Sequence, residues 1–472
     1  MGSRATAAVS GKDKTVWFPA TNNVGRAPLQ NIFTARPGIT NYCRNIVSPV
    51  DAWRLIIDEG CIRYIVECTN EYASQFNPEW KTNEGELDKF IGILYLRGIM
   101  YQRNFPFDFL WSREMGSKAI TDTMSRNRFR DLKKFIRFDR RNMRRKNLEN
   151  DKFAMISWVL NGLVENSMKA YIPDYSMTIN EQLFPTKARC RFTQYMSNKP
   201  DKFGIKFWIL AEVNTKYCYN IIPYLGKDMT RNEQLGTYVV RRLSTPLFGK
   251  GYNITTDNFF TSKFLCEKLL EKKTSLVGTV RGNRKELPQM AKLSLLKTKF
   301  FQSEQVHLAV YQAKRKKTVY LMSTMHRGTS TENNEKKKPE SILFYNKNKF
   351  GVDMLDAMCR MMSTKSGTRR WPLAVFFNIL DIAGINAYIL FCKKTGSKIS
   401  RRKFLFELSK QLRGSSIDED MEIDPQQDEG LANRVTCQIK INCKRNRTIT
   451  LCKKCKKPVC GKCLSNVCLK CQ

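Results

Sequence analysis

This chain has far fewer acidic than basic residues, and it starts without an apolar segment. Its 43 Asp and Glu residues face 82 Lys and Arg residues, which leaves a formal net charge of +39 and a pI near 9.8. A folded protein this basic is expected to bind a polyanion, usually nucleic acid; the alternative is a solvated basic surface, as in a ribosome-associated protein. The first residues (MGSRATAAVSGKDK) hold no apolar stretch, so we expect no secretory signal peptide.

Histidine is almost absent, because His307 and His326 are the only two. Cysteine is plentiful: eight of the 16 lie in the last 36 residues, and the other eight are scattered without a pairing pattern. The scattered cysteines are interpreted as small buried hydrophobes. A reducing compartment follows, in which clustered tail cysteines bind a metal rather than form disulfides, although a disulfide framework is the alternative.

The tail cysteines form four successive pairs, three of them spaced as C-x-x-C and the first with five intervening residues. Each pair can place two thiolates on one tetrahedral zinc ion. A cross-brace would put the first and third pairs on one ion and the second and fourth on another. About 40 residues bury too little apolar surface to fold without such ions. The eight predicted zinc ligands are Cys437, Cys443, Cys452, Cys455, Cys460, Cys463, Cys468 and Cys471.

The loops of this tail are cationic and carry no histidine. RING-type ubiquitin ligases and histone readers commonly use a histidine ligand, so DNA binding through residues such as Lys453 and Lys454 is favoured over protein binding. An acidic stretch, residues 417–430, separates the tail from the body; it carries seven acidic residues and no basic one and is interpreted as a linker.

The body contains two kinds of hydrophobic pattern, one typical of helices and one typical of strands. Helical periodicity runs from about residue 50 to 138 and again from 351 to 412, whereas residues 177–280 contain five short β-branched runs with turn residues between them. The most apolar run, residues 371–392, contains three polar residues that would be costly in a membrane, so it predicts a buried helix. The basic run that includes Arg144, Arg145 and Lys146 suits phosphate contact, or forms a solvated loop.

Three carboxylates stand out as candidate Mg²⁺ ligands for phosphoryl transfer. Asp257 ends the predicted strand GYNITTD, and Asp353 and Asp356 are three residues apart, so a helix would place both on one face. The plainer interpretations are that Asp257 caps the next helix and that the pair lies on the surface.

Five longer motifs resemble segments of a known protein family. TINEQLFPTKARCRFTQYMSNKPDKFGIKFW, ITTDNFFTS, SLVGTVRGNRKELP, YNKNKFGVDMLD and RRWPLAVFFNILDIAGINAYILF resemble segments of piggyBac-type transposases and their transposable-element-derived relatives. The resemblance implies an α/β ribonuclease-H-like catalytic core with an insertion, embedded in an α-helical dimerisation and DNA-binding part, with a C-terminal zinc cross-brace. It also implies two catalytic Mg²⁺ ions, cleavage beside TTAA, and a homodimer acting on double-stranded DNA.

The resemblance sets the expected boundaries. The domains expected are a flexible segment (1–30), helical segments (31–174 and 363–416), core segments (175–283 and 341–362), an insertion (284–340), an acidic linker (417–434) and the cysteine-rich domain (435–472).

One motif departs from the family. The family has T-I-D-E-Q where this chain has TINEQ, so Asn180 replaces the first of four catalytic aspartates; the others match Asp257, Asp353 and Asp356. An amide keeps the shape but loses the charge that bridges two metal ions, a loss of about 10³-fold or more in rate. Glu181 is predicted to point to the opposite face of the strand. Trp371, with Arg369 and Arg370 before it, matches a family tryptophan that contacts DNA; a core aromatic is the alternative.

The sequence therefore predicts a nuclear, dimeric, transposase-derived DNA-binding protein with two zinc ions and little strand cleavage. One alternative is an active two-metal transposase. Another is a chromatin or ubiquitin-pathway adaptor that binds proteins through its tail.

Overall fold

The computed structural model describes residues 8–21, 32–112, 114, 116–197, 199, 201–227 and 232–414, and in the tail residues 435–439, 441–443, 446–448, 450, 452, 454–455 and 457–463. The chain forms two compact units, Met1–Ser416 and Ile417–Gln472. Each unit is described by itself.

The first unit is built on an 11-stranded sheet. Its strands are β1 (Val9–Ser10), β2 (Val16–Pro19), β5 (Ser176–Pro185), β6 (Thr193–Tyr195), β7 (Phe203–Glu212), β8 (Cys218–Pro223), β9 (Asn253–Thr256), β10 (Ser275–Val280), β11 (Thr298–Ser303), β12 (Val306–Lys314) and β13 (Lys317–Ser323). The strand order is β1-β2-β11-β12-β13-β10-β9-β5-β7-β6, and β8 also pairs with β7. A separate pair joins β3 (Gly38–Ile39) to β4 (Tyr171–Ile172).

Five strands form the centre of this sheet in the order β8-β7-β5-β9-β10, and they confirm the five strands predicted from the sequence. β5, β9 and β10 run parallel, whereas β7 is antiparallel to both β5 and β8. This arrangement is consistent with a ribonuclease-H-like core. Because the parallel strands end at the same edge, residues that follow them gather there.

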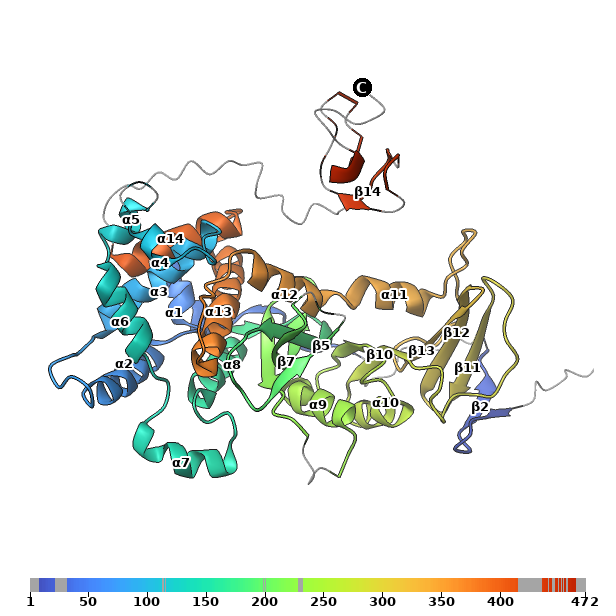
Figure 1. Ribbon diagram of the computed structural model, residues 1–472. Helices are drawn as coiled ribbons and strands as arrows, with labels where there is room; N and C mark the ends of the chain where they lie inside the picture. Colours follow the sequence, from blue (N-terminus) through green and yellow to red (C-terminus); the bar gives the residue numbers. More distant parts are fainter. Residues whose placement is uncertain are drawn as a thin grey trace, which may run out of the picture. The chain divides into compact units, whose positions relative to one another are not determined.

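Helices cover both faces of the sheet (Figure 1). α9 (Leu235–Ser244) and α10 (Lys263–Leu270) pack on one face, and α11 (Glu340–Asn348) and α12 (Gly351–Met361) on the other. α12 lies along β5 and β7, which brings its first turn to the sheet edge where β5 ends its pairing with β9.

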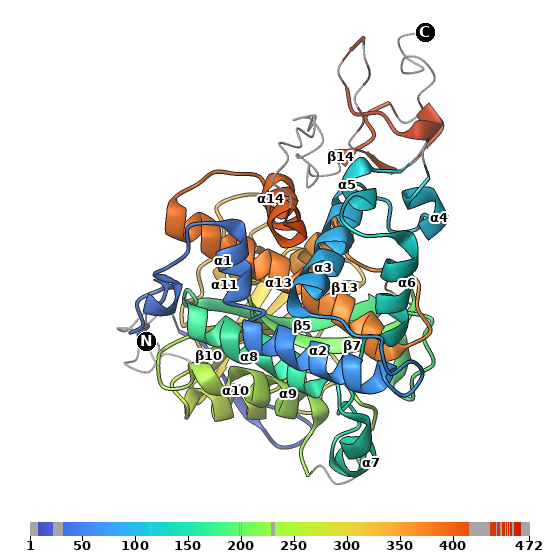
Figure 2. The same cartoon turned by 90° about the vertical axis from the view of Figure 1, so that its left-hand side faces the viewer.

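The remaining helices form a helical part beside the core (Figure 2). They are α1 (Pro49–Arg54), α2 (Glu59–Ala73), α3 (Glu84–Ile99), α4 (Phe107–Leu110), α5 (Lys118–Thr121), α6 (Arg126–Phe135), α7 (Arg141–Asn150), α8 (Ser157–Ala170), α13 (Trp371–Thr395) and α14 (Arg401–Arg413). α14 packs against α3 and α13 against α1, so segments from both sides of the core assemble together.

Helix α13 is the predicted buried helix. It is the one described helix long and apolar enough to cross a membrane, and 94% of its most apolar window is buried inside the protein. Its polar residues are paired: Asn378 Nδ2 donates to Gln182 Oε1 (2.8 Å), and Asn386 Nδ2 donates to the Cys218 carbonyl (2.8 Å). Asp381 accepts hydrogen bonds from the backbone N–H and hydroxyl of Thr364 (2.7 and 2.8 Å). These bonds tie α13 to the sheet and to the loop after α12.

The structure adds detail to three of the expected segments. The expected flexible segment contains ordered structure, because β2 pairs with β11 and the buried Trp17 donates its indole N–H to the Glu286 carbonyl (2.7 Å). Within the expected insertion, β13 pairs with β10 and extends the central sheet. The basic run after residue 140 forms helix α7, and none of its residues is buried.

The second unit is small. It contains the hairpin β14 (Val435–Thr436) and β15 (Arg447–Thr448) and the 3₁₀ turn η5 (Gly461–Cys463). Its described core consists mostly of cysteine: the buried side chains are Cys437, Ile439, Cys452, Val459, Cys460 and Cys463. A core with so few apolar side chains stabilises a fold only weakly unless a metal ion or a covalent cross-link also stabilises it.

Candidate active site and candidate metal centre

Asn180 lies on β5 at the edge where the parallel strands end. Strand alternation puts Asn180 and Gln182 on the same face, the one against which α12 packs. The Asn180 amide Nδ2 lies 3.5 Å from Asp353 Oδ1, and its Oδ1 accepts the Glu181 backbone N–H at 2.9 Å. An amide N–H therefore contacts Asp353 where the family motif has a carboxylate.

Asp257 directly follows β9, whose last pair with β5 is Thr256 with Ile179. Asp257 and Asn180 are thus neighbours at the same edge. Asp257 Oδ1 accepts the Phe259 backbone N–H at 2.9 Å, whereas α10 is capped by Ser262 rather than by Asp257. Burial raises the pKa of Asp257, and the Phe259 N–H partly opposes that rise.

Helix α12 brings in the other two aspartates, which have different partners. The Asp353 side chain is 46% exposed and lies 3.7 Å from the Lys199 ammonium. Asp356 is buried, and the Arg360 guanidinium Nε lies 3.1 Å from its Oδ2. Burial raises the pKa of Asp356, and Arg360 opposes the rise. Asp356 would have to exchange Arg360 for a metal ion to act as a ligand.

Two lysines bring positive charge into the same site. Lys199, 13% exposed, also donates to the Glu181 carbonyl at 3.0 Å. Lys206 lies with its ammonium 3.7 Å from the ring centre of Trp208, and burial lowers its pKa. Glu181 pairs with Trp208 and so belongs to the face opposite Asn180, as alternation predicts. The site is a mixture of acids and cations rather than a ring of carboxylates.

A cavity of about 190 Å³ opens beside Asp356. Gln182 and Lys365 also line it. Gln182 is fully buried, and its Nε2 has no hydrogen-bond partner among the described residues. The cavity gives the site room for a ligand on the Asp356 side.

Two residues of the RRWP segment (369–372), Arg370 and Trp371, contact other parts of the protein. Trp371 packs in an aromatic cluster with Phe153 and Phe192, at 5.3 and 5.1 Å between ring centroids. Arg370 donates to the carbonyls of Ile136 (2.8 Å) and Lys133 at the end of α6, and burial lowers its pKa to about 10. Arg369 is exposed. The predicted DNA contacts of these residues remain predictions.

The predicted DNA contacts of α7 and the tail divide in a similar way. Arg144 is held by Asp139 through two hydrogen bonds of 2.7 and 2.9 Å, whereas Arg145 and Lys146 are exposed. In the tail Lys454 is exposed, and Lys453 lies outside the described residues.

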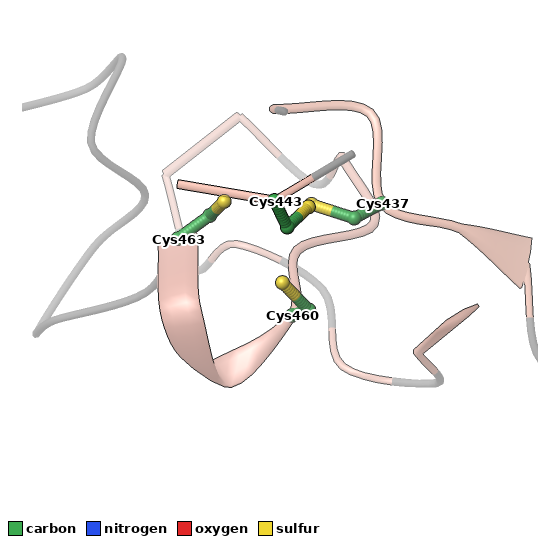
Figure 3. A group of neighbouring side chains, drawn as sticks. All are labelled: Cys437, Cys443, Cys460 and Cys463. Atoms are coloured by element: carbon green, nitrogen blue, oxygen red, sulfur yellow. The ribbon is translucent and has the colours of Figure 1, made fainter. Parts of the chain in front are cut away.

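Four tail cysteines form a candidate metal centre (Figure 3). The sulfur atoms of Cys437, Cys443, Cys460 and Cys463 all lie within 4.8 Å of one another. Tetrahedral zinc with Zn–S bonds near 2.3 Å would hold its sulfurs about 3.8 Å apart, so the cluster needs only a small contraction. The Asn442 N–H points at Cys463 Sγ (3.3 Å), which stabilises a thiolate. The cluster could hold a metal ion.

This grouping is the one predicted for the first zinc site, the first and third cysteine pairs. Cys452 is buried and Cys455 partly buried, whereas Cys468 and Cys471 lie outside the described residues, so the second predicted site stays a prediction.

Sequence reasoning missed three residues of the active site. Arg360 could have been found, because an arginine four residues after Asp356 on a helix is an expected partner. Gln182 could have been found by strand alternation from Asn180. Lys199 had no local signal, since a loop brings it to Asp353 from across the sheet.

Comparisons with known proteins identify a family and several proteins that are similar to this chain in sequence or fold. The family model described as Transposase IS4 matches residues 48–388. Human PiggyBac transposable element-derived proteins 3 and 2 are 27% and 28% identical over 264 and 260 residues, covering 54% and 53% of this chain. The match covers 43% of each, so the chain spans less than half of these curated relatives. A solved piggyBac transposase, in a synaptic complex with hairpin DNA, is 31% identical with a TM-score of 0.77, covering 92% of this chain and 100% of that one.

Proposed function

The chain belongs to the piggyBac-type transposases, and from this membership we propose that it binds transposon-end DNA while cutting it weakly or not at all. The observation that carries the proposal is Asn180, whose amide lies 3.5 Å from Asp353 in the place of the first catalytic aspartate. DNA transposition is the activity of the family, and DNA binding is the part of it that needs no metal-bridging carboxylate at this position.

The catalytic metal ions would be held by Asp257, Asp353 and Asp356. Bound Mg²⁺ would supply activation of the attacking oxygen and stabilisation of the leaving oxygen. The donor set fits this role poorly. Asn180 offers one neutral oxygen, which already accepts the Glu181 N–H, and Asp356 is paired with Arg360. Three carboxylates, one of them paired with an arginine, hold a pair of hydrated divalent cations less tightly than four.

DNA binding is supported by the charge of the whole chain and by the exposed cations of the body. Of the predicted contacts, Arg145, Lys146 and Arg369 are exposed, whereas Arg144 and Arg370 orient protein groups. Their number predicts an affinity that falls steeply with added salt, because each neutralised phosphate releases counterions. We expect a homodimer that works in the nucleus at TTAA-flanked ends.

The tail would contribute a zinc-dependent DNA-binding module. Cys437, Cys443, Cys460 and Cys463 would hold one structural Zn²⁺, since four thiolates in a closed shell are the donor set that zinc prefers. Cys452 and Cys455 would supply half of a second site.

The test is cleavage of a TTAA-flanked transposon-end duplex in Mg²⁺ by this chain and by an Asn180→Asp variant, with duplex binding measured for both. We expect equal binding and cleavage only by the variant. Comparable cleavage by both proteins would instead make the chain a working transposase. Binding by neither would remove the DNA-binding proposal altogether.

A further inference from the structure

The sheet edge that carries the candidate active site continues past it into the insertion. β10 is parallel to β9, and β13 is antiparallel to β10 with Tyr320 opposite Val280. The first residue of β13, Lys317, therefore lies at the same edge as Asp257. β12 ends at this edge too, since Lys314 pairs with Lys317 across the hairpin turn. β11 begins there, because Thr298 pairs with Tyr311.

Cations gather on this end of the insertion. We call them the hairpin patch: Lys297, Lys299, Lys314, Arg315, Lys316 and Lys317. All six are exposed, and none takes part in an ion pair with another residue of the described ranges. Six unpaired cations on the end of two hairpins repel one another unless a polyanion neutralises them.

A partly exposed lysine, Lys349, links this patch to the active site. Burial lowers the pKa of Lys349, the nearby Lys317 lowers it further, and Asp353 raises it. Lys349 thus lies within electrostatic range of both the hairpin patch and the catalytic helix. The positive surface of the insertion and the carboxylates of the site belong to one continuous edge.

The separation between the turn and Asp257 corresponds to about six base pairs. β12 is three strands away from β9 in the order β9-β10-β13-β12, and strands lie about 4.8 Å apart, so the turn lies roughly 14 Å across the sheet from β9. Asp257 is level with Leu321, and Lys317 lies four residues further along the strand, or about 14 Å at 3.4 Å per residue. The two offsets together give about 20 Å, and duplex DNA rises about 3.4 Å per base pair.

The helical part lies at the other end of the sheet from β11–β13 (Figure 1). A duplex held by the helical part and passing the active site would next meet the insertion. We propose that the hairpin patch binds backbone phosphates of the flanking duplex, just beyond the TTAA, about six base pairs from the point of cleavage. This inference rests on the proposed function and assigns a binding surface for the DNA that the transposon end is joined to.

The test uses two matched triple variants of the full chain. Arg315→Gln, Lys316→Gln and Lys317→Gln remove three charges from the hairpin patch. Lys250→Gln, Lys272→Gln and Lys273→Gln remove three exposed charges from the opposite edge, where β9 and β10 begin. Both sets lie in exposed turns, and equal circular dichroism and elution volume would verify that both variants fold.

Affinity is measured between 50 and 200 mM salt on a 40-base-pair duplex with TTAA at its centre. We expect the magnitude of the slope of log affinity against log salt to be smaller by about two to three for the patch variant, because each lost phosphate contact lowers it by about 0.9. The slope of the control variant should stay unchanged. Phosphate-ethylation interference should be lost about six base pairs from the point of cleavage in the patch variant alone. Tight binding with an unchanged slope would overturn this inference only, whereas no binding by the unmodified chain would overturn both proposals.

Discussion

Four thiols surround one point in the tail, whereas the sheet edge brings an amide and a lysine to Asp353, the more exposed of the two aspartates on α12. Both places bring together groups that could hold a cation, oxygen atoms at the sheet edge and sulfur atoms in the tail. Asn180 differs from aspartate by a single group, yet it removes the charge that a divalent cation needs. The cysteine cluster keeps all four of its sulfur donors.

The difference separates two uses of metal. A structural ion stabilises a fold that has few apolar side chains, and its loss would destroy the module. A catalytic ion lowers a reaction barrier, and its loss leaves the fold and the DNA-binding surface in place. The following predictions test this contrast, from the largest expected effect to the smallest.

Breaking the cysteine cluster should have the largest effect. Cys460→Ser leaves three thiols, and structural zinc binding contributes about 10–16 kcal/mol in small zinc modules at neutral pH. We expect zinc content to fall by one ion per chain and β14 and β15 to lose protection from hydrogen exchange. Cys392→Ser, a partly buried cysteine outside the tail, is the control. Unchanged zinc content in Cys460→Ser would contradict the assignment.

Restoring an aspartate at position 180 should have the second largest effect. Asn180→Asp restores the charge opposite Asp353, and we expect cleavage to rise by about 10³-fold, or about 4 kcal/mol of barrier. The readout is the initial rate of strand cleavage in Mg²⁺. Asn180→Ser, which removes the amide without adding charge, should stay inactive; if it cleaves as fast as the aspartate variant, steric obstruction rather than missing charge is the cause.

Asp381 extends the contrast to a fully buried carboxyl group held by hydroxyl and backbone N–H donors. Burial raises its pKa to about 7, against about 3.9 in an unfolded chain. The folded state therefore binds this proton more tightly, and the stability it contributes at low pH is lost as the pH rises through 7. Between pH 5 and 8 the unmodified chain should lose about 3 kcal/mol of unfolding free energy relative to Asp381→Asn. Urea unfolding at both pH values measures this, and parallel profiles would contradict it.

Lys199 should have the smallest effect. Its ammonium lies 3.7 Å from Asp353, where it competes with a divalent cation for that carboxylate. In the Asn180→Asp background, Lys199→Met should tighten Mn²⁺ binding by about three- to tenfold, as expected for removing one partly screened charge. Calorimetric titration measures it. Lys202→Met, an exposed lysine of the same loop, should leave the affinity unchanged.

Local patterns predicted the centre of the fold. Alternation and turn residues located the strands from β5 to β10, and the polar residues within the apolar run correctly identified α13 as a buried helix. The order of the cysteine pairs, with a cross-brace assumed, predicted which four thiols lie together in the described cluster, which could hold a metal ion. These features depend on residues close in sequence, so a single sequence contains the information.

Long-range pairing was what the sequence could not show. Strands were not predicted at TKFFQS and VHLAVYQAK, because flanking lysines hide the alternation that makes them β11 and β12. The strand with Trp17 looked unstructured because its partner lies far along the chain. Lys199 contacts Asp353 from a distant loop, which no spacing rule predicts, whereas Arg360 was overlooked although its spacing to Asp356 indicates the pair.

The strand that contains Trp17 has a consequence for synthesis. Its indole bonds to Glu286, 269 residues later in the chain, so β2 leaves the ribosome long before β11 exists. At about 5–20 residues per second the wait is roughly 15–50 s, during which an apolar strand has no partner. A protein that started after residue 20 would leave β11 as an open edge, and open edges pair with other chains. The first strands of this chain are thus expected to protect the finished protein from aggregation while depending on chaperones during translation.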